Sequence, residues 1–159
     1  MTNKGSKNNK NIYLLLGALT SAIAALAHVG CIIVGGNWYR FFGAGEQMAR
    51  LSEQGHWYPT VVTSAIALIL AIWALYGLSG ARLILKLPLL RLALCLISAI
   101  YLIRGSAFFA LMPLFPDNDL TFWLVSSSIC FVIGCFYTIG THQQWGNLTR
   151  ESFDTKLSS

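Results

Sequence analysis

The sequence predicts an all-α integral membrane protein, a four-helix bundle with a short amphipathic interfacial helix between its first and second spans. Hydrophobic residues make up 55% of the 159 residues and charged residues only 11%, against roughly 25% charged residues in a typical soluble domain. The apolar residues gather in four runs, each close to the ~20 residues that a helix needs to cross the ~30 Å hydrocarbon core of a bilayer. Most lysines and arginines lie in the polar segments around these runs. We therefore expect one four-span transmembrane domain over residues 12–140.

The first predicted span covers residues 12–34 and follows a polar, basic N-terminal tail, residues 1–11. Its apolar run is about twice the length of a signal-peptide core and ends without an A-x-A site, so we expect a retained anchor. Gly17, Ser21 and Ala25 recur every four positions along it. Such a stripe of small residues lets a second helix approach closely, which predicts that this face packs against another span.

The connection after the first span carries apolar and charged side chains at helical spacing. Glu46, Arg50 and Glu53 lie on its polar side. This pattern is typical of a short amphipathic helix that lies in the membrane surface. Gly43 and Gly45 are expected to break or bend it, because glycine adopts backbone conformations that other residues avoid.

The other three predicted spans cover residues of about 60–78, 88–112 and 120–140. Pro59 suits the first turn of the second span, where its missing N–H group is not needed. The prolines after residue 112 are expected to end the third span. Residues 141–159 are polar and predict a C-terminal tail.

The distribution of lysine and arginine predicts the orientation of the chain. One side of the predicted topology carries eight of them: Lys4, Lys7, Lys10, Arg82, Lys86, Arg91, Arg150 and Lys156. The other side carries Arg40 and Arg50, together with four acidic residues. Because cytoplasmic loops are enriched in Lys and Arg, both termini are expected in the cytoplasm. No basic groove with interleaved aromatic residues is visible, so the net charge of +5 is not taken as a sign of nucleic-acid binding.

Arg104 is the main candidate for a functional residue. It lies about eight residues inside the far end of the third predicted span, where an ionised side chain normally needs a partner or a watery cavity. Ser98 and Tyr101 lie on the same arc of this helix, at ~100° per residue. The predicted topology places His28 in the same leaflet. Two interpretations of Arg104 stay open: a snorkelling or purely structural side chain, or a planar fork that binds a carboxylate or an anionic ligand.

Glu46 completes the predicted ligand site, which consists of Arg104, His28, Tyr101, Glu46 and Ser98. The neighbouring glycines would let Glu46 drop toward Arg104. The competing interpretation is local, because Glu46 and Arg50 are four residues apart and would pair on a surface helix.

No catalytic residue and no metal site is predicted. The sequence contains no G-x-S-x-G, no H-E-x-x-H and no glycine-rich phosphate loop, which are the patterns that hydrolases, zinc proteases and nucleotide-binding proteins show. His28 and Cys31 are too few to hold a metal ion. All four cysteines lie in apolar runs without a C-x-x-C pair, so we expect unpaired thiols. The sequence does not indicate a cofactor.

The four-span layout, the glycine-rich linker and the run HVGC…WYRFFGAGE, at residues 28–31 and 38–46, resemble small bacterial inner-membrane proteins of a loosely DoxX-like kind. The resemblance covers the region of the four spans. It implies a multi-pass protein of the bacterial inner membrane, and it assigns no role to any residue.

The function that the sequence favours is non-enzymatic. An outward-facing polar site around Arg104 and His28 would bind a small ligand, such as a lipid, a quinone or another anionic amphiphile, or a membrane-protein partner. A small membrane enzyme that uses His28 and Arg104 for redox or acid–base chemistry is the first alternative. A channel or exporter formed by a homo-oligomer is the second. The stripes of small residues fit all three and do not choose among them.

Overall fold

The computed structural model of the chain describes residues 10–114, 118 and 120–157. Most of the predicted N-terminal tail and part of the segment before the last span lie outside these residues. The described part is helical, without a β-strand, which confirms the predicted all-α class. The elements in chain order are α1 (Ile12–Val34), α2 (Gly36–Phe41), α3 (Glu46–Glu53), α4 (Trp57–Gly80), α5 (Leu90–Ser106), α6 (Phe108–Leu111), the 3-10 helix η1 (Met112–Leu114) and α7 (Leu120–Leu157).

Three helical segments are long and apolar enough to cross a membrane: α1, α4 and the first 27 residues of α7, Leu120–Gly146. With 17 residues, α5 is only ~25 Å long at ~1.5 Å per residue. The described chain therefore has three candidate membrane spans and a fourth, shorter helix beside them.

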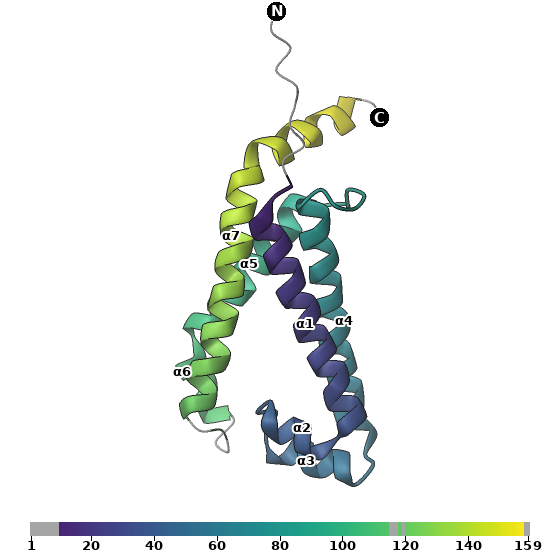
Figure 1. Ribbon diagram of the computed structural model, residues 1–159, viewed down its shortest axis with the longest axis vertical. Coiled ribbons are helices and arrows are strands. Elements are labelled where there is room, and N and C mark those ends of the chain that lie inside the picture. Colours follow the sequence, from purple (N-terminus) through teal and green to yellow (C-terminus); the bar gives the residue numbers. More distant parts are fainter. Residues whose placement is uncertain (1–9, 115–117, 119, 158–159) are drawn as a thin grey trace, which may run out of the picture.

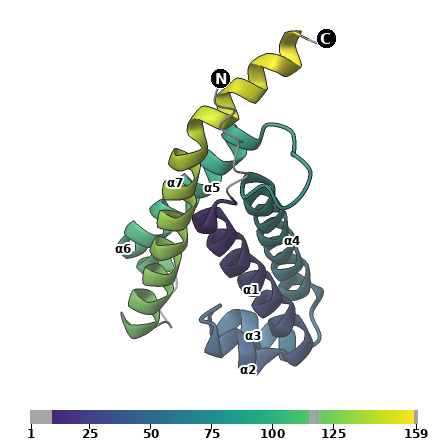
Figure 2. The same cartoon turned by 45° about the horizontal axis from the view of Figure 1, so that its top comes forward.

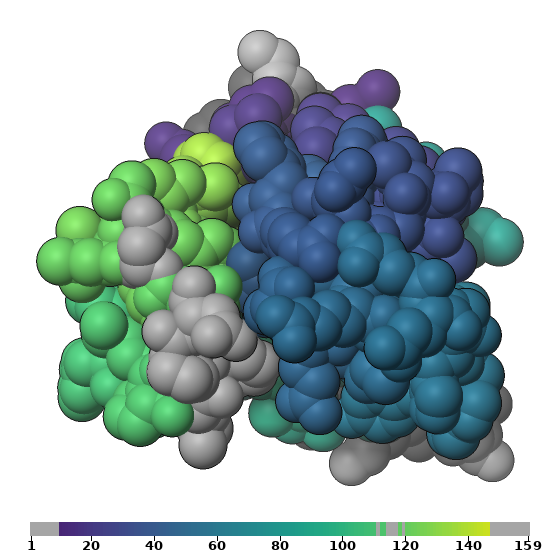
Figure 3. Space-filling model, turned by 90° about the horizontal axis from the view of Figure 1, so that it is seen from below, coloured from purple at the N-terminus to yellow at the C-terminus, as the bar shows by residue number. Residues whose placement is uncertain are grey.

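The long helices pack as two pairs, α1 with α4 and α5 with α7. The pairs meet at the end that holds Asn11, Gly80, Leu90 and Gly140, which we call the tail end (top of Figure 1). They diverge toward the opposite end, the cap end, where α2, α3 and α6 lie. The view in Figure 2 shows the same separation of the pairs. Seen end-on, the residues of α2 and α3 cover one half of the cap end, beside those of α6 and the start of α7 (Figure 3).

Glycines let the helices of each pair approach closely. A Cβ atom added to Gly105 of α5 would lie 2.7 Å from the backbone nitrogen of Phe131 on α7. In the other pair, a Cβ atom on Gly77 of α4 would lie 3.1 Å from Cα of Ala18 on α1. At such distances the two backbones are in contact, so neither glycine has room for a side chain.

A hydroxyl network joins the two pairs where they begin to separate. The hydroxyl of Ser21 lies 3.0 Å from that of Tyr101 and 3.1 Å from that of Tyr137. Tyr137 donates in turn to the carbonyl oxygen of Trp73, at 3.0 Å. The rings of Tyr101 and Tyr137 stack with 5.9 Å between centroids. These four residues, which we call the hub, connect α1, α4, α5 and α7 through buried polar groups with hydrogen-bond partners.

The predicted packing stripe of α1 is confirmed, because Gly17, Ser21 and Ala25 are all buried. The helix begins at Ile12, since the side chain of Asn11 accepts a hydrogen bond from the backbone N–H of Leu14, as an N-cap does. The amide of Asn11 also donates to Oε1 of Gln143 on α7, at 2.9 Å. Asn11, the N-cap residue of α1, therefore helps to hold the two helix pairs together at the tail end.

The connection after α1 forms two short helices, α2 and α3. Gly43 and Gly45, at φ +66° and +93°, separate them, as the sequence indicates for these glycines. The amide of Asn118 donates to the carbonyl oxygen of Gly43 at 2.8 Å. This bond ties the turn between α2 and α3 to Asn118, two residues before α7 begins.

Two helix boundaries differ from the predicted segments. The helix of the third segment ends at Ser106, where Ala107 leaves the helix at φ −96° and ψ 26°, rather than continuing to residue 112. Gly105 and Ser106 are weaker helix formers than the leucines before them. At the other extreme, α7 continues to Leu157, through the segment expected to be a tail. Its glutamines and Trp145 interrupt the apolar pattern but not the helix.

Candidate ligand site at the cap end of α5 and α7

Arg104 lies in the last turn of α5 and faces α7. Its two terminal nitrogens donate to the hydroxyl oxygens of Ser126 and Ser127, each at 3.3 Å. The guanidinium carbon lies 5.3 Å from the centre of the Trp123 ring, within the range of a cation–π contact. The side chain is partly buried. Because the helix ends two residues later, Arg104 is closer to the end of its helix than the sequence pattern indicates.

The close approach at Gly105 explains why Arg104 meets α7. With no side chain at Gly105, α5 comes into contact with the backbone of Phe131. The neighbouring Arg104 is then held against the serines one turn earlier on α7. A bulkier residue at position 105 would move the guanidinium away from these hydroxyls.

The guanidinium of Arg104 keeps capacity for an anion. Of its five N–H groups, two donate to the described hydroxyls. Both bonds are longer than the ~2.7–2.9 Å that is usual when arginine meets a carboxylate. Among the side chains that the structure describes, no carboxylate forms an ion pair with Arg104. The two serine hydroxyls and the face of the Trp123 ring stabilise the guanidinium in part. No described carboxylate neutralises its charge.

A second arginine on α5 makes a similar contact at the tail end, where the guanidinium of Arg91 lies 3.6 Å from the centre of the Trp145 ring. The two arginines are ~20 Å apart along α5, and their tryptophan partners are ~33 Å apart along α7, at ~1.5 Å per residue. The arginine side chains, one near each end of α5, therefore extend away from the middle of the helix. This direction is the one expected of snorkelling side chains.

Glu46 is not a partner of Arg104. It accepts hydrogen bonds from Nε of Arg40 at 2.8 Å and from Nε of Arg50 at 2.9 Å, and Glu53 also pairs with Arg40. The pairing of Glu46 with Arg50 is the local alternative that the four-residue spacing offers, while Arg40 reaches Glu46 across the turn between α2 and α3. Hydrogen bonds from Arg40, and then from Arg50, lower the pKa of Glu46 to about 2. The hydrogen bond from Arg40 also lowers the pKa of Glu53. At neutral pH both carboxylates are ionised, so this exposed network compensates its own two arginines.

The other residues of the predicted site have separate partners. Nδ1 of the His28 ring lies 2.8 Å from the carbonyl oxygen of Ala24, so this nitrogen is the donor. Ser98 donates to the carbonyl oxygen of Leu94 on its own helix, at 2.7 Å. Tyr101 belongs to the hub. The structure thus brings none of these side chains into hydrogen-bond contact with Arg104.

Sequence reasoning missed Ser126, Ser127 and Trp123 as neighbours of Arg104. A signal was present, since three serines in a row, Ser126–Ser128, interrupt an apolar run. Trp123 precedes Ser126 and Ser127 by three and four residues, which places it on the same face of a helix. A buried cation on a neighbouring helix requires hydroxyls or aromatic faces of this kind.

Disulfide bonds do not link the four cysteines. All four thiols are free. Among the described residues, no group of three His, Cys, Asp or Glu side chains is placed to hold a metal ion. Cys31 is buried against Tyr39 of α2 and Ala49 of α3.

Comparisons with protein-family models, curated proteins and solved structures found no match to the chain. The resemblance to DoxX-like proteins therefore stays a prediction from the sequence pattern.

Proposed function

We propose that the chain is an integral membrane protein that binds the anionic head group of a membrane amphiphile at Arg104, Ser126 and Ser127. The observation that carries this proposal is the partly buried Arg104 guanidinium, held by two hydroxyls and a tryptophan ring, with no carboxylate among the described side chains. A phosphate ester or a carboxylate would accept the remaining N–H groups, which the planar fork of arginine presents together. The serine hydroxyls would donate to the same anion once they accept from Arg104.

The proposed placement in the bilayer follows from the two Arg–Trp contacts. Trp123 and Trp145 are ~33 Å apart along α7, close to the ~30 Å thickness of the hydrocarbon core. Each tryptophan would then lie at one interface, where aromatic residues are enriched. Arg104 lies beside Trp123, at the depth where lipid head groups begin. The short helix α5 would span the core with the help of its two extended arginines.

In this arrangement, the positive-inside rule places both termini in the cytoplasm and the cap end on the opposite side of the membrane. For a bacterial inner membrane, as the resemblance suggests, the Arg104 site would face the periplasm. We expect reporter fusions after Ser159 and within residues 47–54 to be active in opposite compartments. Equal activity of a periplasmic reporter at both positions would contradict this orientation.

A binding function is favoured over an enzymatic one by the surroundings of the serines. Both Ser126 and Ser127 accept from Arg104, and no described histidine or carboxylate contacts them. A serine nucleophile needs a base within hydrogen-bond reach. His28 lies on α1, in the other helix pair, and is bonded to Ala24.

The proposal predicts that Arg104→Gln abolishes selectivity for anionic lipid. The purified protein in a neutral maltoside detergent would be titrated with phosphatidylglycerol and with phosphatidylcholine of the same acyl chains, and bound lipid would be counted by native mass spectrometry. We expect the wild-type protein to prefer phosphatidylglycerol, and Arg104→Gln to weaken its binding about tenfold or more, since hydrogen bonds to a charged group contribute roughly 1.5–3 kcal/mol. Arg104→Lys should restore the preference only in part, because an ammonium lacks the planar fork.

Arg91→Gln is the matched control, because Arg91 also contacts a tryptophan of α7 but lies at the tail end. It should keep the lipid preference of the cap-end site. If Arg104→Gln lowered the unfolding temperature yet kept the preference for phosphatidylglycerol, Arg104 would be a structural residue and the proposal would fail.

A further inference from the structure

We infer that the apolar tail of the amphiphile lies along a strip of aromatic rings that leads from Arg104 to helix α2. This inference rests on the proposed function and adds the tail to the head group. The strip consists of Trp123 and Phe122 on α7 and of Phe42, Phe41 and Trp38 in and next to α2.

Ring contacts, together with the packing of Phe122 on Gly43, place the members of the strip one after another. From Trp123, beside the guanidinium of Arg104, the next ring is Phe122, at 5.7 Å between centroids. Phe122 in turn packs against Gly43, in the space that a side chain at this position would occupy. Phe42 directly precedes Gly43 in the sequence, and its ring centre lies 5.1 Å from that of Phe41 and 5.6 Å from that of Trp38. The strip therefore crosses from one helix pair to the other at the cap end.

Gly43 makes this crossing possible. Its φ of +66° is one that residues with a side chain rarely adopt, and its carbonyl oxygen accepts the hydrogen bond from Asn118. The turn and the start of α7 are thereby fixed against each other. As a result, the partly exposed Phe122 continues the surface formed by the rings of α2, while Trp123, at 2% exposed, is buried next to Phe122.

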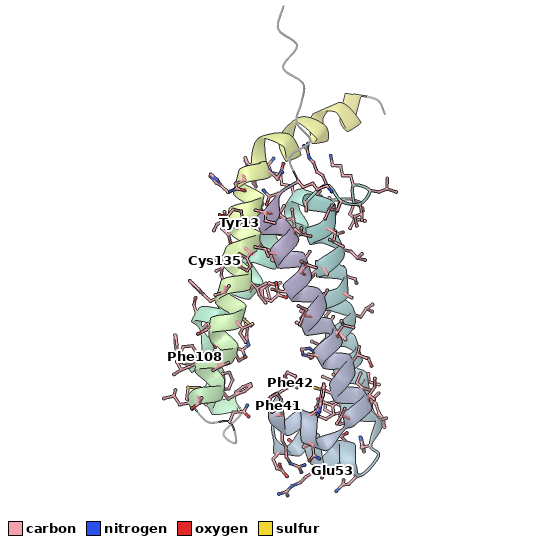
Figure 4. The ribbon with its side chains drawn as sticks, viewed as in Figure 1. Tyr13, Phe41, Phe42, Glu53, Phe108 and Cys135 are labelled. Carbon is pink, nitrogen blue, oxygen red and sulfur yellow. The ribbon has the colours of Figure 1, made fainter. Side chains whose placement is uncertain are left out.

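The α2 part of the strip is exposed although its residues are large and apolar. Phe41 is 77% exposed, Phe42 42% and Trp38 38%, whereas Tyr39 of the same helix is 2% exposed. Helix α2 thus packs against the rest of the cap end through Tyr39, whose hydroxyl donates a hydrogen bond to Thr63 of α4. Its phenylalanines face outward. Figure 4 shows Phe41 and Phe42 on the side of α2 that faces the space between the two helix pairs.

An acyl or isoprenoid chain attached to an anionic head group is the occupant that fits this surface. The exposed rings of the strip, from Phe122 to Phe41, are apolar. Arg40, between Trp38 and Phe41 in the sequence, is paired with Glu46 and Glu53, so only the Arg104 end has a cation without a described carboxylate, which complements an amphiphile with a single charged end. Because the strip is continuous with the Arg104 site, the position of the head group would fix where the apolar tail of the amphiphile begins. A water-soluble anion would use Arg104 and leave the exposed phenylalanines uncovered.

The test compares phosphate monoesters with the same head and different tails. Ethyl, octyl and dodecyl phosphate would be titrated into the purified full-length protein in neutral maltoside, with binding measured by native mass spectrometry. We expect dodecyl phosphate to bind the wild-type protein at least tenfold more tightly than ethyl phosphate. In Phe41→Ala/Phe42→Ala this gain should fall to about threefold or less, while ethyl phosphate binds as it does to the wild-type protein.

Trp57→Ala is the control for a general loss of surface aromatic area. Trp57 is 65% exposed at the same end of the molecule but contacts His56 and Tyr58, outside the strip. It should keep the full effect of tail length. Phe42→Leu, which preserves an apolar side chain, gives a second variant should the double alanine variant fail to fold, and it should show an intermediate gain.

The inference would be overturned if the double variant and Phe42→Leu kept the wild-type dependence on tail length, or if Trp57→Ala lost it equally. The rings of α2 would then contact bulk lipid as an ordinary aromatic belt. Such a result would leave the head-group proposal intact as long as Arg104→Gln weakens all three phosphates. Failure of the proposed function is distinguishable, since Arg104→Gln would then bind every ester as the wild-type protein does.

Discussion

Replacing Gly105 with alanine is expected to force α5 and α7 apart and to destabilise the protein. The new Cβ atom would lie 2.7 Å from the backbone nitrogen of Phe131 and 2.8 Å from its Cα. Backbone atoms in the middle of a helix have no alternative rotamer, so the two helices must separate. Overpacking of this kind costs about 1–3 kcal/mol. We expect a lower unfolding temperature in detergent, followed by circular dichroism, and a weakened phosphatidylglycerol preference, because Arg104 would lose its contact with Ser126 and Ser127.

Gly146→Ala on α7 provides the matched control. Apart from its chain neighbours and the backbone of its own helix, no heavy atom lies within 4 Å of the position that its Cβ would take. Alanine is favoured over glycine in a helix by up to ~1 kcal/mol, so the unfolding temperature should stay the same or rise. Equal stability of Gly105→Ala and the wild-type protein would show that α5 and α7 are not in backbone contact at this point.

The second large effect is expected from Tyr137→Ala, which removes the centre of the hub. Tyr137 is fully buried, stacks on Tyr101 and fills the space beside Gly17, whose Cβ would lie 3.0 Å from its ring. Truncation of a buried aromatic side chain leaves a cavity and costs about 3–5 kcal/mol. Chemical unfolding in mixed micelles would measure the loss.

Tyr137→Phe separates packing from hydrogen bonding. It keeps the ring and removes the bonds to Ser21 and to the carbonyl oxygen of Trp73. Hydrogen bonds between helices in membranes contribute about 0.6 kcal/mol on average and up to ~1.7, so a small loss is expected. Tyr58→Ala, at an exposed tyrosine of α4, should have little effect on stability. If Tyr137→Ala were equally harmless, the two helix pairs would be held together by contacts other than the hub.

The sequence predicts the helices well where local chemistry marks their ends. The first helix begins and ends as expected, because Asn11 caps its start and Gly35, at φ +82°, ends it. The break at Ala107 was not predictable from hydropathy, since the residues from 107 to 112 continue the apolar run. That error placed Arg104 deep inside a long helix, whereas it lies in the last turn of α5.

The candidate site was predictable only at its centre. An arginine in an apolar run is conspicuous because its burial is unfavourable, and this singled out Arg104. Its neighbours come from α7, more than twenty residues away, and depend on the contact at Gly105. The pair of Glu46 and Arg50 is visible in the sequence because it lies within one helical turn. The addition of Arg40 depends on the turn at Gly43, and no spacing rule predicts it.

The division into two helix pairs has a consequence for how the chain is made. Each pair is continuous in sequence, with α1 and α4 completed by Gly80 and α5 beginning at Leu90. Because chains fold from the N-terminus during synthesis, the first hairpin can close its own glycine contacts before the second leaves the ribosome. Ser21, the donor or acceptor for two tyrosines, is then already in place in the first hairpin. Tyr137 is the last hub residue to be translated, so the hub is completed only when α7 packs on α5 and this second hairpin meets the first.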